Sequence, residues 1–356
     1  MLKTIDRAKS TPLHVQLREL FEKQVLDGKL EPESLFPSER ELCRRYNVSQ
    51  ITVRQAIRSL EQRGALVCIP RKGTYVAKKL PEQKLNSSVG MFLPENQGMI
   101  ESPFVAQLIA GVKSILQKKG VLLVLLSENE NFTHQASDPK PLDGIIVTDP
   151  HSSDMRLREF QKKRIPVVVV GRPSAPNIHY VDSDNVGIGR LMTRHLFEAG
   201  FRKPAFVGFS KEQTLTKDRL AGYKTEVRNH GLQVHRNLIS IHDRSENVEK
   251  DYTESLLKNG ADSLVCEDDL MALRTIKSIH VLGLSVSKDI GIVGCNNSSF
   301  VHYSNPPISS VEIFPDKIGA CAAEKLLCIM EGAECDIQTI VPHKLYVRTS
   351  SQGETQ

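Results

Sequence analysis

The segment PSERELCRRYNVSQITVRQAIRSLEQRG, residues 37–64, carries the local signals of two short helices joined by a tight turn. Ser38 follows a proline and has Glu41 three residues later, which is the spacing of a capping box and predicts the start of a helix. Asn47 tolerates the left-handed backbone conformation, so Asn47 and Val48 are expected to form the turn. The segment therefore predicts a pair of helices close to the start of the chain.

The second helix of the pair is expected to begin with Ser49 as its cap and to end at Gly64. Its apolar residues recur at helical spacing and form one stripe: Val53, Ala56, Ile57 and Leu60. Its polar and basic residues lie off that stripe: Gln50, Thr52, Arg54 and Arg58. Two helices with a short turn and a polar outer face on the second form a helix-turn-helix, which can enter the major groove of DNA. An ordinary helical hairpin in a small core has the same spacing.

The flanking segments favour the first interpretation. An earlier helix is predicted over residues 11–28, from a Thr-Pro start to an Asp-Gly end. Apolar and polar residues alternate over residues 66–76 around Pro70-Arg71-Lys72-Gly73, which predicts a β-hairpin with a basic, glycine-bearing tip. A helix, a helix-turn-helix and a basic hairpin make a winged helix. Two cations and a glycine at the tip suit close approach to a phosphate backbone.

The charge distribution separates this segment from the rest of the chain. Residues 1–80 hold 16 Lys and Arg against 9 Asp and Glu, a net charge of +7, and the other 276 residues carry −2 of the total of +5. A basic module attached to a nearly neutral body indicates a nucleic-acid partner.

Four motifs in the basic segment resemble those of GntR-type winged helices. They are FPSER (36–40), VSQITVRQAI (48–57), LEQRG (60–64) and RKGTYV (71–76), and the resemblance covers residues 10–77. It implies double-stranded DNA as the partner. The predicted DNA-binding residues are Ser38, Arg40, Ser49, Gln50, Thr52, Arg54, Arg71, Lys72, Gly73 and Thr74. Gln50 departs from the family, which usually has Arg there. Because Arg favours guanine and Gln favours adenine, we expect an operator that deviates from the family's usual core.

Composition sets further bounds. The amino-terminal residues are polar, and the longest apolar runs are too short to span a bilayer, so neither a signal peptide nor a membrane segment is expected. The seven cysteines are scattered and lack a CxxC pair, which predicts reduced thiols in a cytoplasmic protein. The histidines show no metal-ligand spacing, so no metal site is predicted. The sequence also has no GxSxG motif and no P-loop, so no cofactor or catalytic residue is predicted. The polar residues 78–88 are predicted to link the winged helix of residues 1–77 to a second domain.

Residues 89–350 change to a pattern of short apolar runs that alternate with helical stretches. Such alternation predicts a parallel α/β architecture. The number of predicted strands favours two lobes over one sheet. Ligands of such sheets bind at the carboxyl ends of the strands, so two facing lobes would enclose a cleft there. The glycines of VGIGR, residues 186–190, are expected to let a helix pack closely.

The second domain resembles the LacI/GalR effector domain, which is related to periplasmic sugar-binding proteins. The motifs that carry the resemblance are SPFVAQLIAGV (102–112), PLDGIIV (141–147), HYVDSDNVGIGRLMTRHLFEAGFRKPAFVG (179–208), DRLAGY (218–223), VCEDDLMA (265–272) and DIGIVGCNNS (289–298). Residues 341–348 match a closing strand. The resemblance implies a two-lobed, periplasmic-binding-protein-like fold after the α+β winged helix, and a small-molecule effector of the sugar type.

The resemblance also implies effector-binding residues. Phe104 would be an apolar platform for a sugar face, and Arg219 a fork that bonds two hydroxyls or a carboxylate. Asp268 would accept hydroxyl protons. Asn296 stands where the family commonly has Asp, and Arg172 follows a strand and could point into the cleft.

Several features depart from the effector-domain pattern. The usual Asn-Asp pair is Asp268-Asp269 here, and the later Asp-Asp pair is Asn296-Asn297. Residues 127–141 carry little helical pattern where the family has a helix, which predicts a trimmed first lobe. Two of these residues also have a structural interpretation. Arg219 could pair with a neighbouring carboxylate, and Asp269 could be a helix N-cap.

Together these features predict a transcription regulator. It would act as a homodimer, held mainly by the α/β domains, on a roughly palindromic operator, and a sugar or sugar derivative would relieve repression. A ligand-dependent activator and a DNA-binding protein whose α/β domain only dimerises remain alternatives. An enzyme would need a nucleophile–base set or a metal cluster, and a transport protein would need an export signal; the sequence shows none of these.

Overall fold

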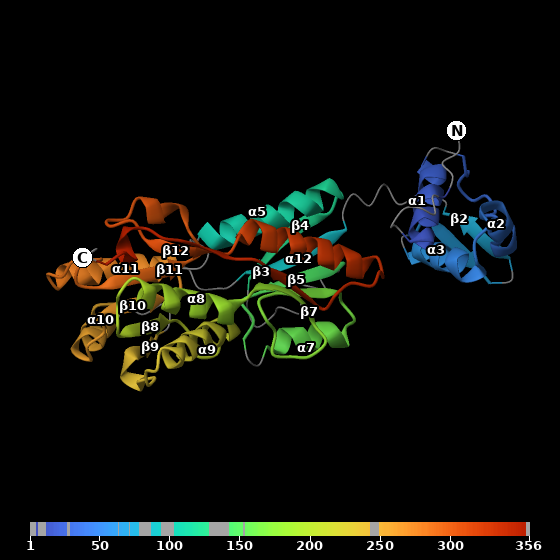
Figure 1. Cartoon of the computed structure of the whole chain (residues 1–356). Coiled ribbons are helices and arrows are strands. Elements are labelled where there is room, and N and C mark those ends of the chain that lie inside the picture. Colours follow the sequence, from blue (N-terminus) through green and yellow to red (C-terminus); the bar gives the residue numbers. More distant parts are fainter. Residues whose placement is uncertain are drawn as a thin grey trace. The chain divides into compact units, whose positions relative to one another are not determined.

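The structure is a computed structural model, and Figure 1 shows it as a ribbon. It describes residues 5, 12–26, 29–62, 64–70, 72–77, 87–93, 103–127, 142–151, 154–242 and 249–353. The chain divides into two units, Met1–Asn86 and Ser87–Gln356. Residues 78–86 of the predicted linker lie outside the described residues, while Ser88, assigned to the linker from the sequence, is the first residue of a strand.

The first unit is a winged helix. Its elements are α1 (Leu13–Leu26), α2 (Glu39–Tyr46), α3 (Gln50–Gln62), β1 (Leu66–Ile69) and β2 (Gly73–Val76). The four residues of the predicted stripe on α3 are all buried and join α1 and the wing in one apolar core. β1 and β2 pair antiparallel, as the alternation predicted.

Local signals set the ends of α2 and α3. The Ser38 Oγ accepts a hydrogen bond from the Glu41 backbone N–H at 3.3 Å, and Asn47 has the left-handed backbone (φ 50°) that the turn requires. The Ser49 Oγ accepts a hydrogen bond from the Thr52 N–H at 3.2 Å and caps α3. The Glu41 side chain pairs with Arg45 at 2.7 Å. The helix-turn-helix prediction is therefore confirmed.

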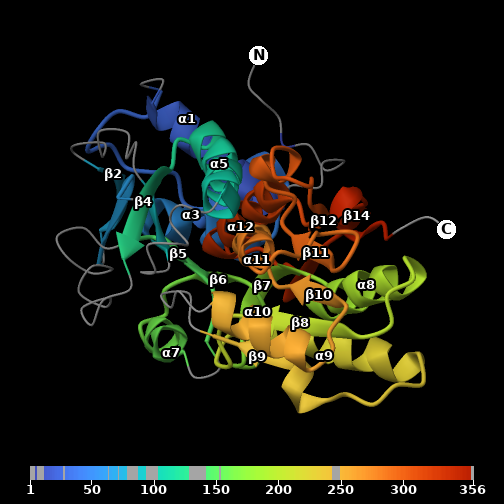
Figure 2. The same ribbon diagram turned by 90° about the vertical axis from the view of Figure 1, so that its left-hand side faces the viewer.

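The second unit contains two lobes, each built on a six-stranded sheet (Figures 1 and 2). The strands of lobe 1 are, in sheet order, β13 (Gln338–Val341), β7 (His179–Ser183), β6 (Val167–Val170), β5 (Gly144–Thr148), β3 (Ser88–Leu93) and β4 (Leu122–Ser127), all parallel. Its helices are α5 (Pro103–Lys118), α7 (Met155–Lys162) and α12 (Pro315–Met330). β4 forms one edge of this sheet.

Lobe 2 is built on the second six-stranded sheet. Its strands are, in sheet order, β14 (Lys344–Tyr346), β12 (Ser309–Glu312), β11 (Gly291–Cys295), β10 (Ser263–Cys266), β8 (Pro204–Gly208) and β9 (Ile239–Ile241). β14 runs antiparallel to β12, and the other neighbours are parallel. Its helices are α8 (Asn185–Glu198), α9 (Thr214–Asn229), α10 (Glu249–Lys258) and α11 (Asp269–Val281), with 3-10 turns η1 (Arg236–Leu238), η2 (Ser299–His302) and η3 (Thr349–Ser351).

The chain passes between the lobes at residues 183–185, 312–315 and 341–344. The prediction of one closing strand over residues 341–348 is wrong. The segment divides between the lobes, because β13 belongs to the sheet of lobe 1 and β14 to the sheet of lobe 2. The segment 127–141, for which a trimmed lobe was predicted, lies outside the described residues after Ser127.

Close helix packing stabilises lobe 2. A Cβ on Gly189 of α8 would overlap the backbone carbonyl of Arg219 on α9, and a Cβ on Gly222 would overlap the carbonyl of Val186. The glycines therefore let the two helix backbones approach, as the VGIGR motif predicted. Among the described residues, no helix is both long enough and apolar enough to cross a bilayer.

Candidate DNA-binding surface and effector cleft

The outer face of α3 presents polar and apolar side chains to solvent. Gln50 and Arg54 are exposed, and Ile51 between them is 70% exposed. Thr52 is half-buried, and its hydroxyl lies 2.7 Å from the Ser49 hydroxyl. Residues at the amino-terminal end of a recognition helix are those that contact base edges. The sequence reasoning did not select Ile51, although an exposed apolar side chain there can contact a thymine methyl group.

One carboxylate on α2 organises this face. The Glu39 Oε2 accepts hydrogen bonds from Gln50 Nε2 at 2.9 Å and from Arg54 Nη2 at 3.0 Å, and its Oε1 accepts from Arg54 Nε at 3.1 Å. The hydrogen bonds from Arg54 and then Gln50 lower the pKa of Glu39, and the hydrogen bond with Glu39 raises the pKa of Arg54. Sequence reasoning missed Glu39 because its partners lie 11 and 15 residues away.

The contacts with Glu39 occupy part of the hydrogen-bonding capacity of Gln50 and Arg54. Bidentate pairing with adenine needs both the amide N–H and the amide oxygen of Gln. Glu39 accepts one of the two Nε2 hydrogens of Gln50, so the second Nε2 hydrogen and the Oε1 acceptor are not used by this contact. In the part of the chain that the structure describes, Arg54 uses its Nε and Nη2 for Glu39, and no acceptor is found for its Nη1.

The other predicted DNA-binding residues surround this face. Ser38 caps α2 beside Glu39, and Arg40 is exposed on the first turn of α2. Lys72 is exposed at the tip of the wing, and Gly73 has φ 121°, a backbone region that favours glycine. Thr74 pairs with Cys68 across the hairpin. Arg71 lies outside the described residues.

Arg219 lies on α9 of lobe 2 and is 1% exposed. Its Nε donates to Asn185 Oδ1 at 3.0 Å, and its Nη1 donates to the backbone carbonyl of Glu267. Asn185 in turn donates to Asp182 Oδ1 at 2.9 Å. The guanidinium therefore links the carboxyl ends of β7 and β10, where the sequence predicted the cleft.

Asp182, at the end of β7, is a buried carboxyl next to this network. Burial raises its pKa to about 6, and the hydrogen bond from the Ser183 N–H and the positive charge of Arg219 act in the opposite direction. Asp182 was not among the predicted site residues, although it lies in the matched HYVDSDN motif.

Two polar contacts join the lobes across the cleft. Arg172, which follows β6 in lobe 1, forms a bidentate ion pair with Asp218 of α9 in lobe 2, at 2.8 Å and 2.6 Å. The hydrogen bond with Asp218 raises the pKa of Arg172. Asp149, after β5 in lobe 1, accepts a hydrogen bond from Gln213 Nε2 of lobe 2 at 2.6 Å. The lobes are therefore closed on each other in this structure.

The remaining predicted effector residues occupy different positions. Phe104 is half-buried at the start of α5 and packs against the main apolar core. Asn296 follows β11 with φ 103°, an unusual conformation for a residue other than glycine. Asp268 is buried and caps α11 by accepting from the Met271 N–H at 2.8 Å.

The alternative that Asp269 is a helix N-cap is wrong, because Asp268 occupies that position. Asp269 is buried and accepts hydrogen bonds from the Ser298 N–H at 2.7 Å and the Ser310 hydroxyl at 2.5 Å. Burial raises its pKa to about 7. It holds the turn after β11 against β12, which is a structural role.

Three buried polar atoms near the closed cleft lack a hydrogen-bond partner within the described residues: Ser183 Oγ, Gln213 Oε1 and Thr216 Oγ1. They lie at the end of β7 and at the start of α9. A buried polar atom without a partner is unfavourable, so hydroxyl groups of a ligand would find partners here. Within the described ranges, no cluster of three or more His, Cys, Asp or Glu residues could hold a metal ion.

Known proteins match both parts of the chain. Residues 13–76 match the bacterial regulatory proteins of the gntR family, and residues 193–351 match a periplasmic binding protein-like domain. The arabinose metabolism transcriptional repressor of Geobacillus stearothermophilus is 25% identical over 97% of this chain and 99% of its own length. The ribose operon repressor of Halalkalibacterium halodurans is 27% identical over 76% of this chain and 81% of its own length.

Solved structures share the fold of the second unit. A putative LacI transcriptional regulator from Bacillus cereus superposes with a TM-score of 0.71 at 25% identity, over 75% of this chain and 99% of its own. A structure of the CelR–cellobiose complex is 23% identical and matches 95% of this chain and 98% of its own chain, with a TM-score of 0.70. At this identity the match shows a shared fold. The chain thus joins a GntR-family helix-turn-helix domain to a periplasmic-binding-protein-like domain of the LacI/GalR type.

Proposed function

We propose that this protein is a sequence-specific transcription regulator that represses its operator until a sugar or sugar derivative binds the cleft. The observation that carries the proposal is the exposed face of α3, where Gln50, Ile51 and Arg54 stand side by side in a winged helix. The net charge of +7 over residues 1–80 supports a DNA partner. The relatives named as arabinose and ribose repressors support repression and a sugar ligand.

The cleft supports ligand control. A ligand changes DNA affinity only if it binds two lobe arrangements with different affinity. The Arg172–Asp218 and Gln213–Asp149 contacts join the two lobes, so an arrangement in which the lobes separate would lose them. The unpartnered Ser183, Gln213 and Thr216 atoms would bond a polyhydroxyl ligand in that arrangement. Arg219, Asp268 and Asn296 are proposed to contribute by holding the strand ends around it.

A homodimer is part of the proposal. Three apolar side chains of the edge strand β4 are exposed to solvent: Leu122, Val124 and Leu125. An exposed, apolar edge strand favours association, and a two-fold axis there would place two winged helices on a palindromic operator. We further propose that the protein works in the cytoplasm and has no catalytic role, as its relatives are named regulators.

The proposal is tested in two steps. Selection of bound duplexes from fragmented genomic DNA gives the operator, and fluorescence anisotropy then measures its affinity with and without pentoses, hexoses, uronic acids and phosphosugars. We expect one sugar class to stabilise the protein in a thermal shift and to release the operator. A sugar that strengthens operator binding would indicate an activator or a corepressor mechanism. If no sugar in the panel has either effect, the proposed sugar control is wrong and the alternative of an α/β domain that only dimerises is favoured.

A further inference from the structure

A basic hollow on lobe 2 is lined by residues of α9, of the edge strand β9 and of the segments next to them. Its volume is about 640 Å³, within the range of small-molecule sites. Its basic lining consists of Lys211, Lys224, Arg228 and Arg236, and His242 also lines it. None of the predicted effector residues lines it, so this hollow is separate from the cleft between the lobes.

The cations of the hollow come from three segments of the chain. Lys224 and Arg228 are one turn apart on α9 and therefore share a face of the helix. Lys211 follows β8, and Arg236 opens the 3-10 turn before β9. No carboxylate lines the hollow, and none of the four cations has an ion-pair partner within the described ranges.

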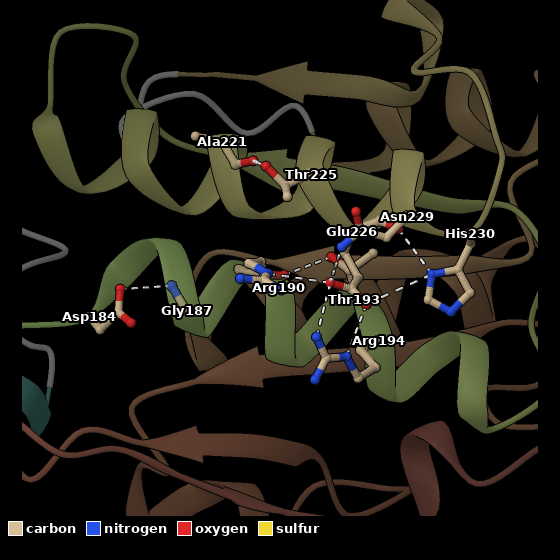
Figure 3. Close-up of polar contacts among 11 residues, drawn as sticks. Asp184, Gly187, Arg190, Thr193, Arg194, Ala221, Thr225, Glu226, Asn229 and His230 are labelled. Atoms are coloured by element: carbon tan, nitrogen blue, oxygen red, sulfur yellow. Dashed lines mark hydrogen bonds and ion pairs between the residues drawn. The ribbon is translucent and has the colours of Figure 1, made fainter.

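The two carboxylates of α9 are used elsewhere. Figure 3 shows Glu226 turned towards α8, where its oxygens lie 2.9 Å from Arg194 Nε and 3.4 Å from Arg190 Nε. The hydrogen bond from Arg194 lowers the pKa of Glu226, whose side chain is only 3% exposed. Asp218 pairs with Arg172 across the cleft. The positive charges of Lys224 and Arg228 are therefore not compensated by acids of their own helix.

The hollow combines this charge with an apolar wall. Lys224 is half-buried, and a cation that is partly removed from water without a counter-charge is unfavourable, so an anion at this point would be bound favourably. Arg228 and Arg236 can each bond two phosphate oxygens. Ile239 and Ile241 of β9 line the same hollow and suit a carbon skeleton.

We propose that Lys211, Lys224, Arg228 and Arg236 form a second ligand site, which binds a phosphorylated metabolite of about the size of a sugar bisphosphate. Four cations from three segments provide enough charge for two phosphate groups, and Ile239 and Ile241 in the same lining suit the sugar carbons. The site does not depend on the proposed operator binding or on the ligand of the cleft.

Isothermal titration of the full chain with fructose 1,6-bisphosphate tests the proposal. The double variant Lys224→Gln/Arg228→Gln should bind about 100-fold more weakly, since each lost charge-assisted contact corresponds to roughly a tenfold change. The matched control Lys113→Gln/Lys118→Gln removes two cations from α5 and should keep the affinity of the unmodified chain. The cleft variant Arg172→Gln should also keep it. Equal melting temperatures of the variants check that all of them fold.

Three results would overturn the proposal. Absence of bisphosphate binding at millimolar concentration removes the site. Unchanged affinity in the double variant, with loss in Arg172→Gln, places the ligand in the cleft. Binding of a hexaglutamate peptide that the double variant loses, without binding of the bisphosphate, makes the hollow a docking groove for an acidic chain and not a metabolite site.

Discussion

The Glu39 carboxylate on α2 forms two hydrogen bonds with the Arg54 guanidinium on α3, at 3.1 Å to Nε and 3.0 Å to Nη2. The same carboxylate accepts from Gln50 at 2.9 Å, so one acidic group fixes two polar side chains on the outer face of α3. On the proposed DNA-binding face, this carboxylate would repel phosphates but would also order the groups proposed to read bases. Its effect should therefore differ between operator and random DNA.

Glu39→Gln should lower the ratio of specific to non-specific affinity by about tenfold. Without the negative charge, binding to any duplex becomes stronger, while Arg54 and Gln50 must be ordered when the operator binds. Anisotropy titrations with the operator and a scrambled duplex of equal length measure the ratio. Glu41→Gln is the matched control, since Glu41 is on the same helix and pairs with Arg45. A ratio that stays constant in Glu39→Gln would show that the carboxylate has no ordering role.

Arg54→Ala should weaken operator binding by between roughly fivefold and 150-fold, and should relax the preference for guanine at one position of each half-site. The reason is that the free Nη1 edge of Arg54 is expected to bond the guanine O6 and N7 atoms. Gel-shift titrations against operators with single base changes measure both effects. Arg45→Ala on α2 provides the comparison. Equal operator affinity in Arg54→Ala would remove Arg54 from the base-reading set.

Operator affinity should fall steeply with salt, with a log–log slope of about −0.9 for each phosphate neutralised. Lys72→Ala should make that slope shallower by about one unit and weaken all duplexes similarly, because an exposed wing lysine contacts phosphates and not bases. Titrations at four or more salt concentrations give the slope. A selective loss on one sequence would instead assign Lys72 to base reading.

The parts of this structure that the sequence predicted depend on local chemistry. Ser38, Asn47 and Ser49 act within a few residues of themselves, and the stripe from Val53 to Leu60 needs only helical spacing. The alternation of strands and helices likewise predicted the two lobes, because most apolar runs are long enough to indicate a buried strand.

The parts that it did not predict depend on contacts between distant segments. Glu39 meets Arg54 across 15 residues, and Arg219 meets the Glu267 carbonyl across 48. Neither partner has a local signature. β9 has three residues, and β13 and β14 have four and three, so their apolar patterns are too short to be told from loops. The basic hollow shows no sequence motif because its cations come from separate elements.

Asp182→Asn should stabilise the protein at neutral pH. The folded-state pKa of Asp182 is raised from 3.8 to about 6, so the folded state binds more protons than the unfolded state between these values. Its contribution to stability therefore falls as pH rises from about 4 to 6 and stays low above that. The gain in Asp182→Asn should follow the opposite course and reach on the order of 3 kcal/mol at pH 7. Asn can keep both hydrogen bonds, since both reach Oδ1.

Chemical denaturation at several pH values tests the expected gain in Asp182→Asn, with the exposed Asp251→Asn as control. A difference that does not vary with pH would show that Asp182 is ionised in the fold.

Thr216→Val should change unliganded stability and ligand affinity in opposite directions. The Thr216 Oγ1 is buried near the cleft without a partner within the described residues, so replacement by an isosteric methyl group removes an unsatisfied hydroxyl. The unliganded protein should gain about 1–2 kcal/mol in unfolding free energy. If the same hydroxyl bonds the effector, the variant should bind that ligand about tenfold more weakly, and higher ligand concentrations should be needed to release the operator. Thr225→Val is the matched control on the same helix, because its hydroxyl already donates to the Ala221 carbonyl at 2.8 Å (Figure 3). A rise in stability without any loss of ligand affinity would mean that Thr216 lies in the closed cleft but outside the ligand's reach.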